Sequence, residues 1–116
     1  MTKKITLLQD EAAALVTKTS TTLSLQSKTT HILARLHAVN NAGTLPTLDV
    51  VVQHSPDGST WTTILTFTQV TTSTDSNEDK QFKITDGLLF PYVRAVATIA
   101  GTNPSYDFTT TIYEGA

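Results

Sequence analysis

The sequence predicts an all-β protein, an antiparallel β-sandwich of about seven or eight strands with an N-terminal arm. Apolar and polar residues alternate with a period of two in several runs, which is typical of strands that bury one face. About one residue in five is threonine, a β-branched type that favours pleated sheets. A length of 116 residues favours one domain. Residues 17–116 are expected to form the sandwich, and residues 1–16 an arm or a short first element.

The first third of the chain predicts an arm followed by two strands. Residues 3–8 fit a short strand or an ordered arm, and the alanines of residues 10–16 favour at best a marginal helix. Residues 17–25 are rich in hydroxyl groups and alternate as a strand does. Residues 31–39 form the next predicted strand. Its core face consists of Ile32, Ala34, Leu36 and Ala38.

A β-hairpin is predicted over residues 47–67, where a Pro-Asp-Gly turn separates two β-rich runs. A loop with an even number of residues gathers the large apolar side chains on one face, whereas an odd loop does not. The even loop sets these pairs: Leu48 with Phe67, Val50 with Leu65, Val52 with Thr63 and His54 with Trp61. Trp61 is therefore expected in the core, where its truncation to alanine costs about 3–5 kcal/mol.

Further strands are predicted after an exposed loop at residues 71–79. They cover residues 80–84, 91–99 and 106–113, and residues 85–87 form a turn between the first two. With these elements the chain reaches the strand number of a small sandwich.

One pattern occurs twice in the sequence. Gly-Thr-x-Pro-(Thr/Ser)-apolar-Asp-apolar spans residues 43–50 and residues 101–108, each time after a strand that carries an arginine, Arg35 or Arg94. Glycine supplies unusual φ angles and proline interrupts pairing, so each copy is expected to turn a strand and restart it. Two interpretations stay open: similar hairpins that stack as the halves of a sandwich, or a chance recurrence of turn chemistry.

No metal site is expected. Residues 75–79 alternate oxygen-bearing side chains as a calcium loop does, and Asp86 falls at its last ligand position, but Lys80 stands where the sharp turn needs glycine. A solvated acidic loop is the expected structure. His31 and His37 lie about 20 Å apart on an extended strand, which is too far for them to share one zinc ion.

Composition argues against several classes of function. The formal net charge of −2 offers no basic surface for nucleic acid. No run is long and apolar enough for a membrane span, and residues 9–11 (Gln-Asp-Glu) interrupt any signal peptide. The chain has no cysteine. Neither a nucleophile elbow nor a phosphate loop occurs, so the protein is expected to be no enzyme and to carry no cofactor.

Two stretches, LDVVVQHSPDGSTW and YVRAVATIAGTNPSYDF, carry a resemblance to small virion proteins of tailed bacteriophages. In outline the similarity covers residues 20–116. It implies a β-sandwich that decorates the capsid by binding the major capsid protein, or one that belongs to the head–tail neck. It further implies a virion structural protein, made in the cytoplasm of the bacterial host, that forms a homo-oligomer, with a trimer favoured.

A carbohydrate-binding module is the competing class of function. Its candidate stacking platforms are Trp61, Tyr92, Tyr106 and Tyr113. The alternation places Trp61 and Tyr106 on apolar faces, which argues against this interpretation.

Connectivity predicts which end of the sandwich meets a partner. If successive strands run antiparallel, the connections at residues 43–46, 71–79 and 101–104 cluster at one end. Recognition usually lies on the longer loops of a rigid scaffold, although plain solvated connections are the alternative. The candidate contact residues at this end are Thr44, Pro46, Asp75, Asp79, Asn103 and Pro104.

Overall fold

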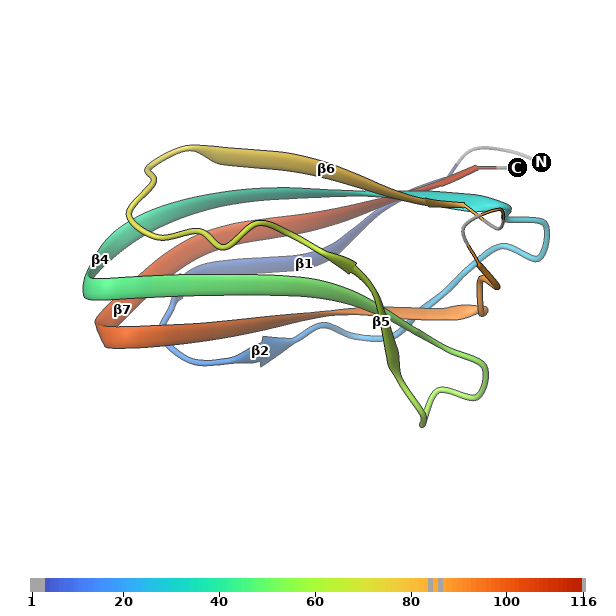
Figure 1. The fold of residues 1–116 in the computed structure, drawn as a ribbon, viewed down its shortest axis with the longest axis horizontal. Coiled ribbons are helices and arrows are strands. Elements are labelled where there is room, and N and C mark those ends of the chain that lie inside the picture. Colours follow the sequence, from blue (N-terminus) through green and yellow to red (C-terminus); the bar gives the residue numbers. More distant parts are fainter. Residues whose placement is uncertain (1–3, 84, 86, 116) are drawn as a thin grey trace.

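Strands β4 (His31–Ser55) and β7 (Tyr92–Gly115) form the framework of the computed structural model, which describes residues 4–83, 85 and 87–115. The two strands pair antiparallel along nearly their whole length, from His31 opposite Gly115 to Ser55 opposite Tyr92. Midway along, both bend together, so that the paired ribbon doubles back on itself (Figure 1). One long ribbon therefore supplies two central strands to each layer of a sandwich.

The remaining strands extend the two layers at their sides. β1 (Lys4–Ala14) pairs with the second half of β7, and β6 (Ser76–Lys83) pairs with the first half of β4. β5 (Thr62–Thr66) pairs with the second half of β4, whereas β2 (Lys18–Thr19) and β3 (Leu23–Ser24) pair with the first half of β7. The result is one antiparallel sheet of seven strands folded over itself. The predicted all-β sandwich is confirmed.

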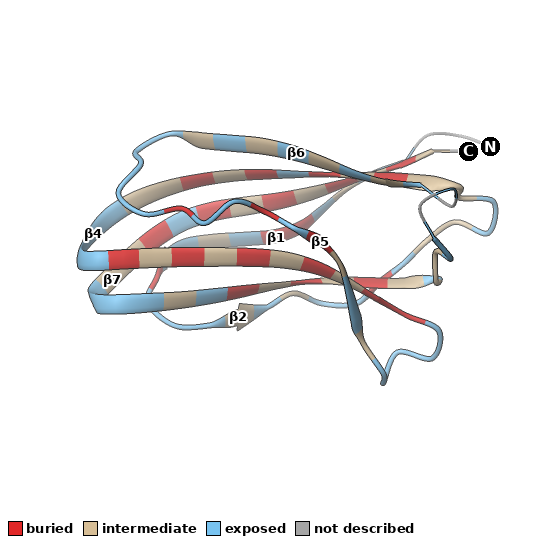
Figure 2. Ribbon diagram, viewed as in Figure 1, coloured by how far each residue is buried: buried red, intermediate tan, exposed pale blue. Residues whose placement is uncertain are grey.

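The core lies between the two layers, where the inner faces of β4 and β7 meet. Buried and less buried residues alternate along both strands (Figure 2). The predicted core face of the first strand half is confirmed, because Ile32, Ala34, Leu36 and Ala38 are all buried. The opposite layer contributes Leu48, Val50, Val52, Val93, Ala95 and Ala97. Period-two alternation thus locates the main core correctly.

The N-terminal segment lies in the same sheet as the rest of the chain. β1 pairs with β7 from Lys4 opposite Glu114 to Ala14 opposite Tyr106, and its Leu8 and Ala14 side chains are buried in the core. Residues 10–14, for which a marginal helix was an option, continue the strand. Residues 1–3 lie outside the described part of the chain.

The predicted exposed loop at residues 71–79 is wrong in its second part. Residues 76–79 belong to β6, which begins at Ser76 and pairs with β4 from Ala38 back to His31. The segment is polar, so its sequence gave no apolar alternation, but the edge of β4 offers it a complete hydrogen-bond ladder. Ile84, the last residue of the predicted strand, and Asp86 in the predicted turn lie outside the described residues.

The predicted hairpin register is also wrong. Val52 lies opposite Leu65 rather than Thr63, and His54 lies opposite Thr62 rather than Trp61, with a bulge between Val52 and Gln53. The loop is long because its own side chains cap it. The Asp57 carboxylate accepts hydrogen bonds from the Ser59 and Thr60 amides at 2.8 and 2.9 Å, while the Ser55 hydroxyl accepts from the Gly58 amide at 2.8 Å.

Trp61 consequently lies on the outer face and not in the core. Its side chain is partly exposed, and the Arg94 guanidinium stacks over its ring at 4.3 Å from the ring centroid. Arg94 in turn donates a hydrogen bond of 2.8 Å to the Gln53 side chain. The indole is held by a cation–π contact on the surface, not by burial between the layers.

We expect truncation of Trp61 to alanine to lower the free energy of unfolding by about 1 kcal/mol, because only a half-buried ring and one cation–π contact are lost. Phe67, buried on the same hairpin, is the matched control, and its replacement by alanine should cost about 3–5 kcal/mol. Denaturant unfolding of both variants measures the difference. Equal losses of unfolding free energy in the two variants would contradict the surface position of Trp61.

Candidate functional site

Of the connections predicted to cluster, residues 43–46, 71–75 and 101–104 lie together at one end of the sandwich, whereas residues 76–79 belong to β6 (Figure 1). We call the bend formed by residues 43–46 of β4 and residues 101–104 of β7 the corner. The segment after β5 is tied to it, because the Ser73 carbonyl accepts a hydrogen bond of 2.8 Å from the Asn40 amide. The Tyr106 hydroxyl donates to the carbonyls of Val70 and Thr71 at 3.1 and 2.8 Å.

The two copies of the repeated pattern pair with each other at the corner. Thr44 lies opposite Thr102, with register shifts on both sides of this pair. The prediction that each copy turns its strand is therefore correct, but the copies form one shared bend and not two separate hairpins that stack. Each bends at the same point because the strands stay paired while they fold over.

The close approach of the two backbones explains why glycine occupies positions 43 and 101. A Cβ on Gly101 would lie 2.7 Å from the Leu45 carbonyl oxygen, and a Cβ on Gly43 would lie 2.9 Å from the Pro104 Cα. Both glycines also have positive φ angles, +115° and +127°. No side chain fits at either position without moving the opposite strand.

Each copy also holds its third residue in the left-handed region. Leu45 has a φ of 50° and Asn103 a φ of 49°. Asparagine tolerates this conformation, but for leucine it costs about 1 kcal/mol. The Leu45 side chain is 87% exposed, so no packing within the described chain offsets that cost.

Leu45 is the residue that sequence reasoning missed. The repeated pattern leaves its position variable, although its alignment with Asn103 in the other copy is a usable signal. An exposed, apolar side chain in a strained conformation on a rigid bend is a feature of contact sites.

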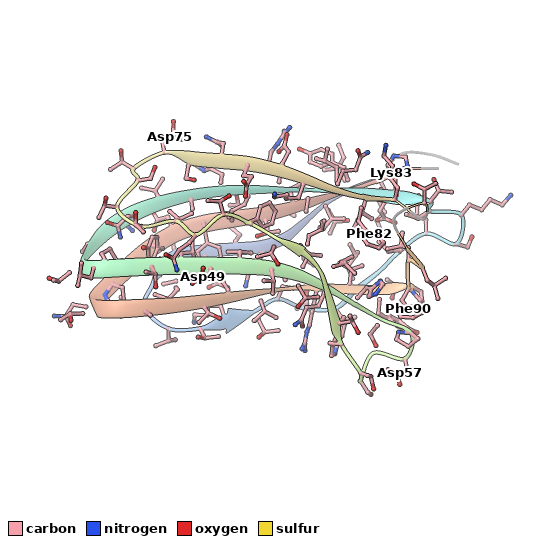
Figure 3. All side chains as sticks on the ribbon, in the orientation of Figure 1. Asp49, Asp57, Asp75, Phe82, Lys83 and Phe90 are labelled. Atoms are coloured by element: carbon pink, nitrogen blue, oxygen red, sulfur yellow. The ribbon has the colours of Figure 1, made fainter. Side chains whose placement is uncertain are left out.

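The predicted contact residues are only partly gathered at the corner. Thr44 and Asn103 are exposed there and Pro104 is partly exposed, whereas Pro46 is buried and offers no side-chain surface. Asp75 precedes β6 at the same end (Figure 3). Asp79 lies further along β6, away from the corner.

Both aspartates belong to polar contacts on the outer face. The Asp79 carboxylate accepts two hydrogen bonds from the Arg35 guanidinium at 2.8 and 3.0 Å, and the hydrogen bond from Arg35 lowers the pKa of Asp79. Arg35 also donates to the Tyr113 hydroxyl at 3.2 Å. Asp75 lies 3.0 Å from His37 Nε2. These exposed polar contacts contribute little stability.

The aspartates of the two repeats tie neighbouring segments to the ribbon. Asp107 accepts hydrogen bonds from the Ala13 amide at 2.6 Å and from Asn41 at 2.9 Å, and these two contacts lower its pKa. Asp49 accepts from the Gln69 side chain at 3.0 and 3.1 Å. In both repeats the aspartate therefore anchors a neighbouring segment of the chain.

No group of three or more His, Asp or Glu side chains in the described residues is arranged to hold a metal ion. The calcium-loop pattern at residues 75–79 is mostly strand, and Asp86 lies outside the described part. Within that same part no helix long and apolar enough to cross a bilayer occurs.

The buried histidine lies at the end of the sandwich opposite the corner. His54 is 5% exposed, and its ring packs against Phe82 and Phe90 with centroids 5.9 and 4.5 Å away (Figure 3). Its Nδ1 accepts a hydrogen bond of 3.1 Å from the Phe90 amide. Burial favours the neutral ring and lowers the pKa of His54.

Comparison with known proteins reveals only shared folds. No family model and no curated protein matches the chain. PBSX exported protein XepA matches with a TM-score of 0.61 and 14% identity, over 97% of this chain and 37% of XepA. A chain of infectious bursal disease virus Gx strain matches with a TM-score of 0.52 and 11% identity, over 96% of this chain and 32% of the viral one.

A third similar structure contains the CBM22-1 and GH10 modules of endo-1,4-β-D-xylanase 10B from Clostridium thermocellum, in complex with xylohexaose. Its TM-score is 0.50 at 13% identity, over 75% of this chain and 17% of the xylanase chain. The chain thus spans at most 37% of each of these three proteins. The neighbours include a viral protein, and likeness at these identities shows the fold alone.

We expect replacement of Gly101 by alanine to lower the free energy of unfolding by about 3 kcal/mol, because the new Cβ collides with the Leu45 carbonyl. Gly58 is the matched control. It also has a positive φ, +79°, but no atom lies within 4 Å of a Cβ placed there, so its replacement should cost about 1 kcal/mol. Chemical denaturation compares the two variants. Similar losses of unfolding free energy in the two variants would mean that the two backbones at the corner move apart easily.

We expect the free energy of unfolding to fall as the pH drops below the ordinary histidine pKa of about 6.5. His54 has a lowered pKa in the folded state, so the unfolded chain takes up a proton first, and stability is lost until the pH passes the folded pKa. Unfolding of His54→Phe between pH 7.5 and about 5 should show a weaker pH dependence than the parent. Equal slopes in the parent and His54→Phe would contradict this assignment.

Proposed function

We propose that this chain is a non-enzymatic structural protein of a tailed bacteriophage particle, a capsid decoration protein that binds the lattice of the major capsid protein through its corner. The observation that carries the proposal is Leu45, an exposed apolar side chain held in a strained backbone conformation on a rigid bend. Such a residue lowers the stability of the free protein, so its presence favours a role in a complex.

The corner has the physical properties of a docking surface. Its backbone is held because β4 and β7 pair on both sides of the bend, so little conformational entropy is lost when a partner binds. Leu45, Thr44 and Asn103 are exposed together, which offers one apolar anchor flanked by polar groups. A single contact of this size is weak, but binding to a repeating lattice gains from many identical sites.

The resemblance of residues 20–116 to virion proteins supports a place in the particle, and the viral fold neighbour is compatible with it. The same corner would serve a component of the head–tail neck, which is the alternative location. On this proposal the chain is made in the cytoplasm of the bacterial host and resides in the virion.

Carbohydrate binding is a second candidate, since Trp61 lies on the outer face beside Arg94 and Gln53, and not in the core. The guanidinium of Arg94 covers one ring face, which limits stacking by a sugar. Binding of soluble glycans that is lost in Trp61→Ala and kept in variants of the corner would favour this candidate over the virion role.

We expect Leu45→Asn to weaken binding to tail-free capsids of the phage whose genome carries this sequence by at least about tenfold. The variant copies Asn103 into the matching position of the other repeat. Because asparagine tolerates the left-handed conformation, the free energy of unfolding should stay the same or rise by up to about 1 kcal/mol. Co-sedimentation with capsids measures the binding.

Leu88→Asn is the matched control, since Leu88 is another leucine that is 71% exposed. It should bind as the parent does. Unchanged capsid binding by Leu45→Asn would remove the corner from the interface. If electron microscopy located the parent on isolated necks and not on capsids, the head–tail neck would be its place in the particle.

A further inference from the structure

Strand β1 forms the one long edge of the described sheet with an uncharged run, residues 5–9, between Lys4 and Asp10. β1 pairs with β7 on one side, and no strand of the described residues pairs with its other side. The opposite edge of the same layer is β6, whose sequence SNEDKQFK is mostly charged or polar. β5 has 5 residues, and β2 and β3 have 2 each. Charges and shortness protect these edges from pairing, whereas residues 5–9 of β1 carry no charge.

The open part of β1 also carries an apolar row. Ile5 and Leu7 are 60% and 56% exposed, and they lie opposite Tyr113 and Thr111 of β7 on the outer face of the layer. Leu33 lies opposite Tyr113 on the next strand and is partly exposed. The pairing of β1 with β7 is regular from Lys4 to Leu7, and a bulge follows between Leu7 and Gln9. The bulge limits the usable edge to the first part of the strand.

We propose that this edge pairs with the same edge of a second copy, antiparallel and about a twofold axis that passes at Thr6. The layers that contain β1 and β6 in the two copies then form one continuous sheet across the dimer. Ile5 of each copy faces Leu7 of the other, so that four exposed apolar side chains pack together. The inference does not depend on the proposed virion function.

The register follows from the side-chain pattern. Ile5 and Leu7 must face outer-face residues of the other copy. This leaves three residues at which the twofold axis can be centred: Ile5, Thr6 and Leu7. A centre at Ile5 sets Leu7 opposite residue 3, and a centre at Leu7 sets Ile5 opposite Gln9, in the bulge. Only the centre at Thr6 pairs both apolar residues within the regular run. In that register the Lys4 side chains of the two copies lie at opposite ends of the paired strands.

A second copy fits this edge better than another edge of the chain does. Pairing with β6 would set Ile5 and Leu7 beside its exposed outer row, which includes Asp79 and Lys83. Desolvating charges against apolar side chains is unfavourable. Self-pairing sets apolar groups against apolar groups and satisfies the open backbone hydrogen bonds of both strands.

The paired segment is short, so the dimer should be weak in solution. Two strand segments with four apolar side chains bury less than the roughly 1,200 Å² of a standard interface. We expect a dissociation constant on the order of 100 μM. A twofold dimer also differs from the trimer expected from the resemblance to virion proteins.

Disulfide cross-linking tests the register, because the protein has no cysteine of its own. Ile5→Cys and Leu7→Cys variants are oxidised singly and as an equal mixture. The mixture should give the crossed 5–7 disulfide in at least about fivefold excess over the 5–5 and 7–7 products, since only the crossed pair lies directly opposite. Predominance of a 5–5 or a 7–7 product, or no cross-linked dimer at all, would overturn the proposal.

Sedimentation tests the pairing without cross-linking. Leu7→Lys places a charge in the apolar row at an exposed position, and it should weaken dimerisation at least about tenfold while unfolding stays cooperative. Leu88→Lys makes the same change at a leucine outside β1 and should dimerise as the parent does. A monomeric parent at millimolar concentration, a parent trimer, or equal association of both variants would each contradict the twofold pairing.

Discussion

The close approach of the β4 and β7 backbones at the corner is the constraint on which the rest of the structure depends. Two strands that stay paired must bend at the same place, and each must then tolerate the other at van der Waals distance. Gly43 and Gly101 permit this because a Cβ at either position would collide with the opposite strand. The sequence repeat follows, since the same geometric problem occurs once in each strand.

The bend brings the inner faces of a single ribbon against each other. Alternating apolar residues on both halves of β4 and β7 then meet in one core, and a flat ribbon becomes two layers. The bend also organises its surroundings. Tyr106, buried just after the corner, holds the carbonyls of Val70 and Thr71, while Asp107 holds the end of β1. The exposed tip is therefore supported from several directions, which explains how Leu45 is kept in a strained conformation.

The main core was predictable from the sequence because burial on one side of a strand imposes a period of two. Ile32 to Ala38 obey this rule, and the structure agrees with it. The hairpin register was not predictable by the same means. A bulge between Val52 and Gln53 changes the parity, and the loop length depends on hydrogen bonds that the Ser55 and Asp57 side chains accept from backbone amides, which have no apolar signature.

The candidate site was likewise predictable only in part. The clustering of the corner and the segment after β5 followed from antiparallel connectivity, which is a property of the chain order. The burial of Pro46 and the exposure of Leu45 depend on how the two repeats face each other, which no single repeat reveals. Asp79 was misplaced because β6 is recognisable as a strand only through its partner, β4, and polar composition alone indicates a loop.

The two proposed contact surfaces lie far apart, and that separation decides how they could work together. Lys4 to Leu7 pair with the last residues of β7, next to the chain ends, whereas the corner lies at the other end of a molecule 44 Å long (Figure 1). A partner bound at the corner therefore leaves the β1 edge open to a second copy. Protein anchored by its corner to a surface would hold its β1 edges at a raised local concentration, so that an edge pairing too weak to persist in dilute solution would link neighbours there. The short open run of β1 is consistent with this division, because a longer unprotected edge would associate before any partner was bound.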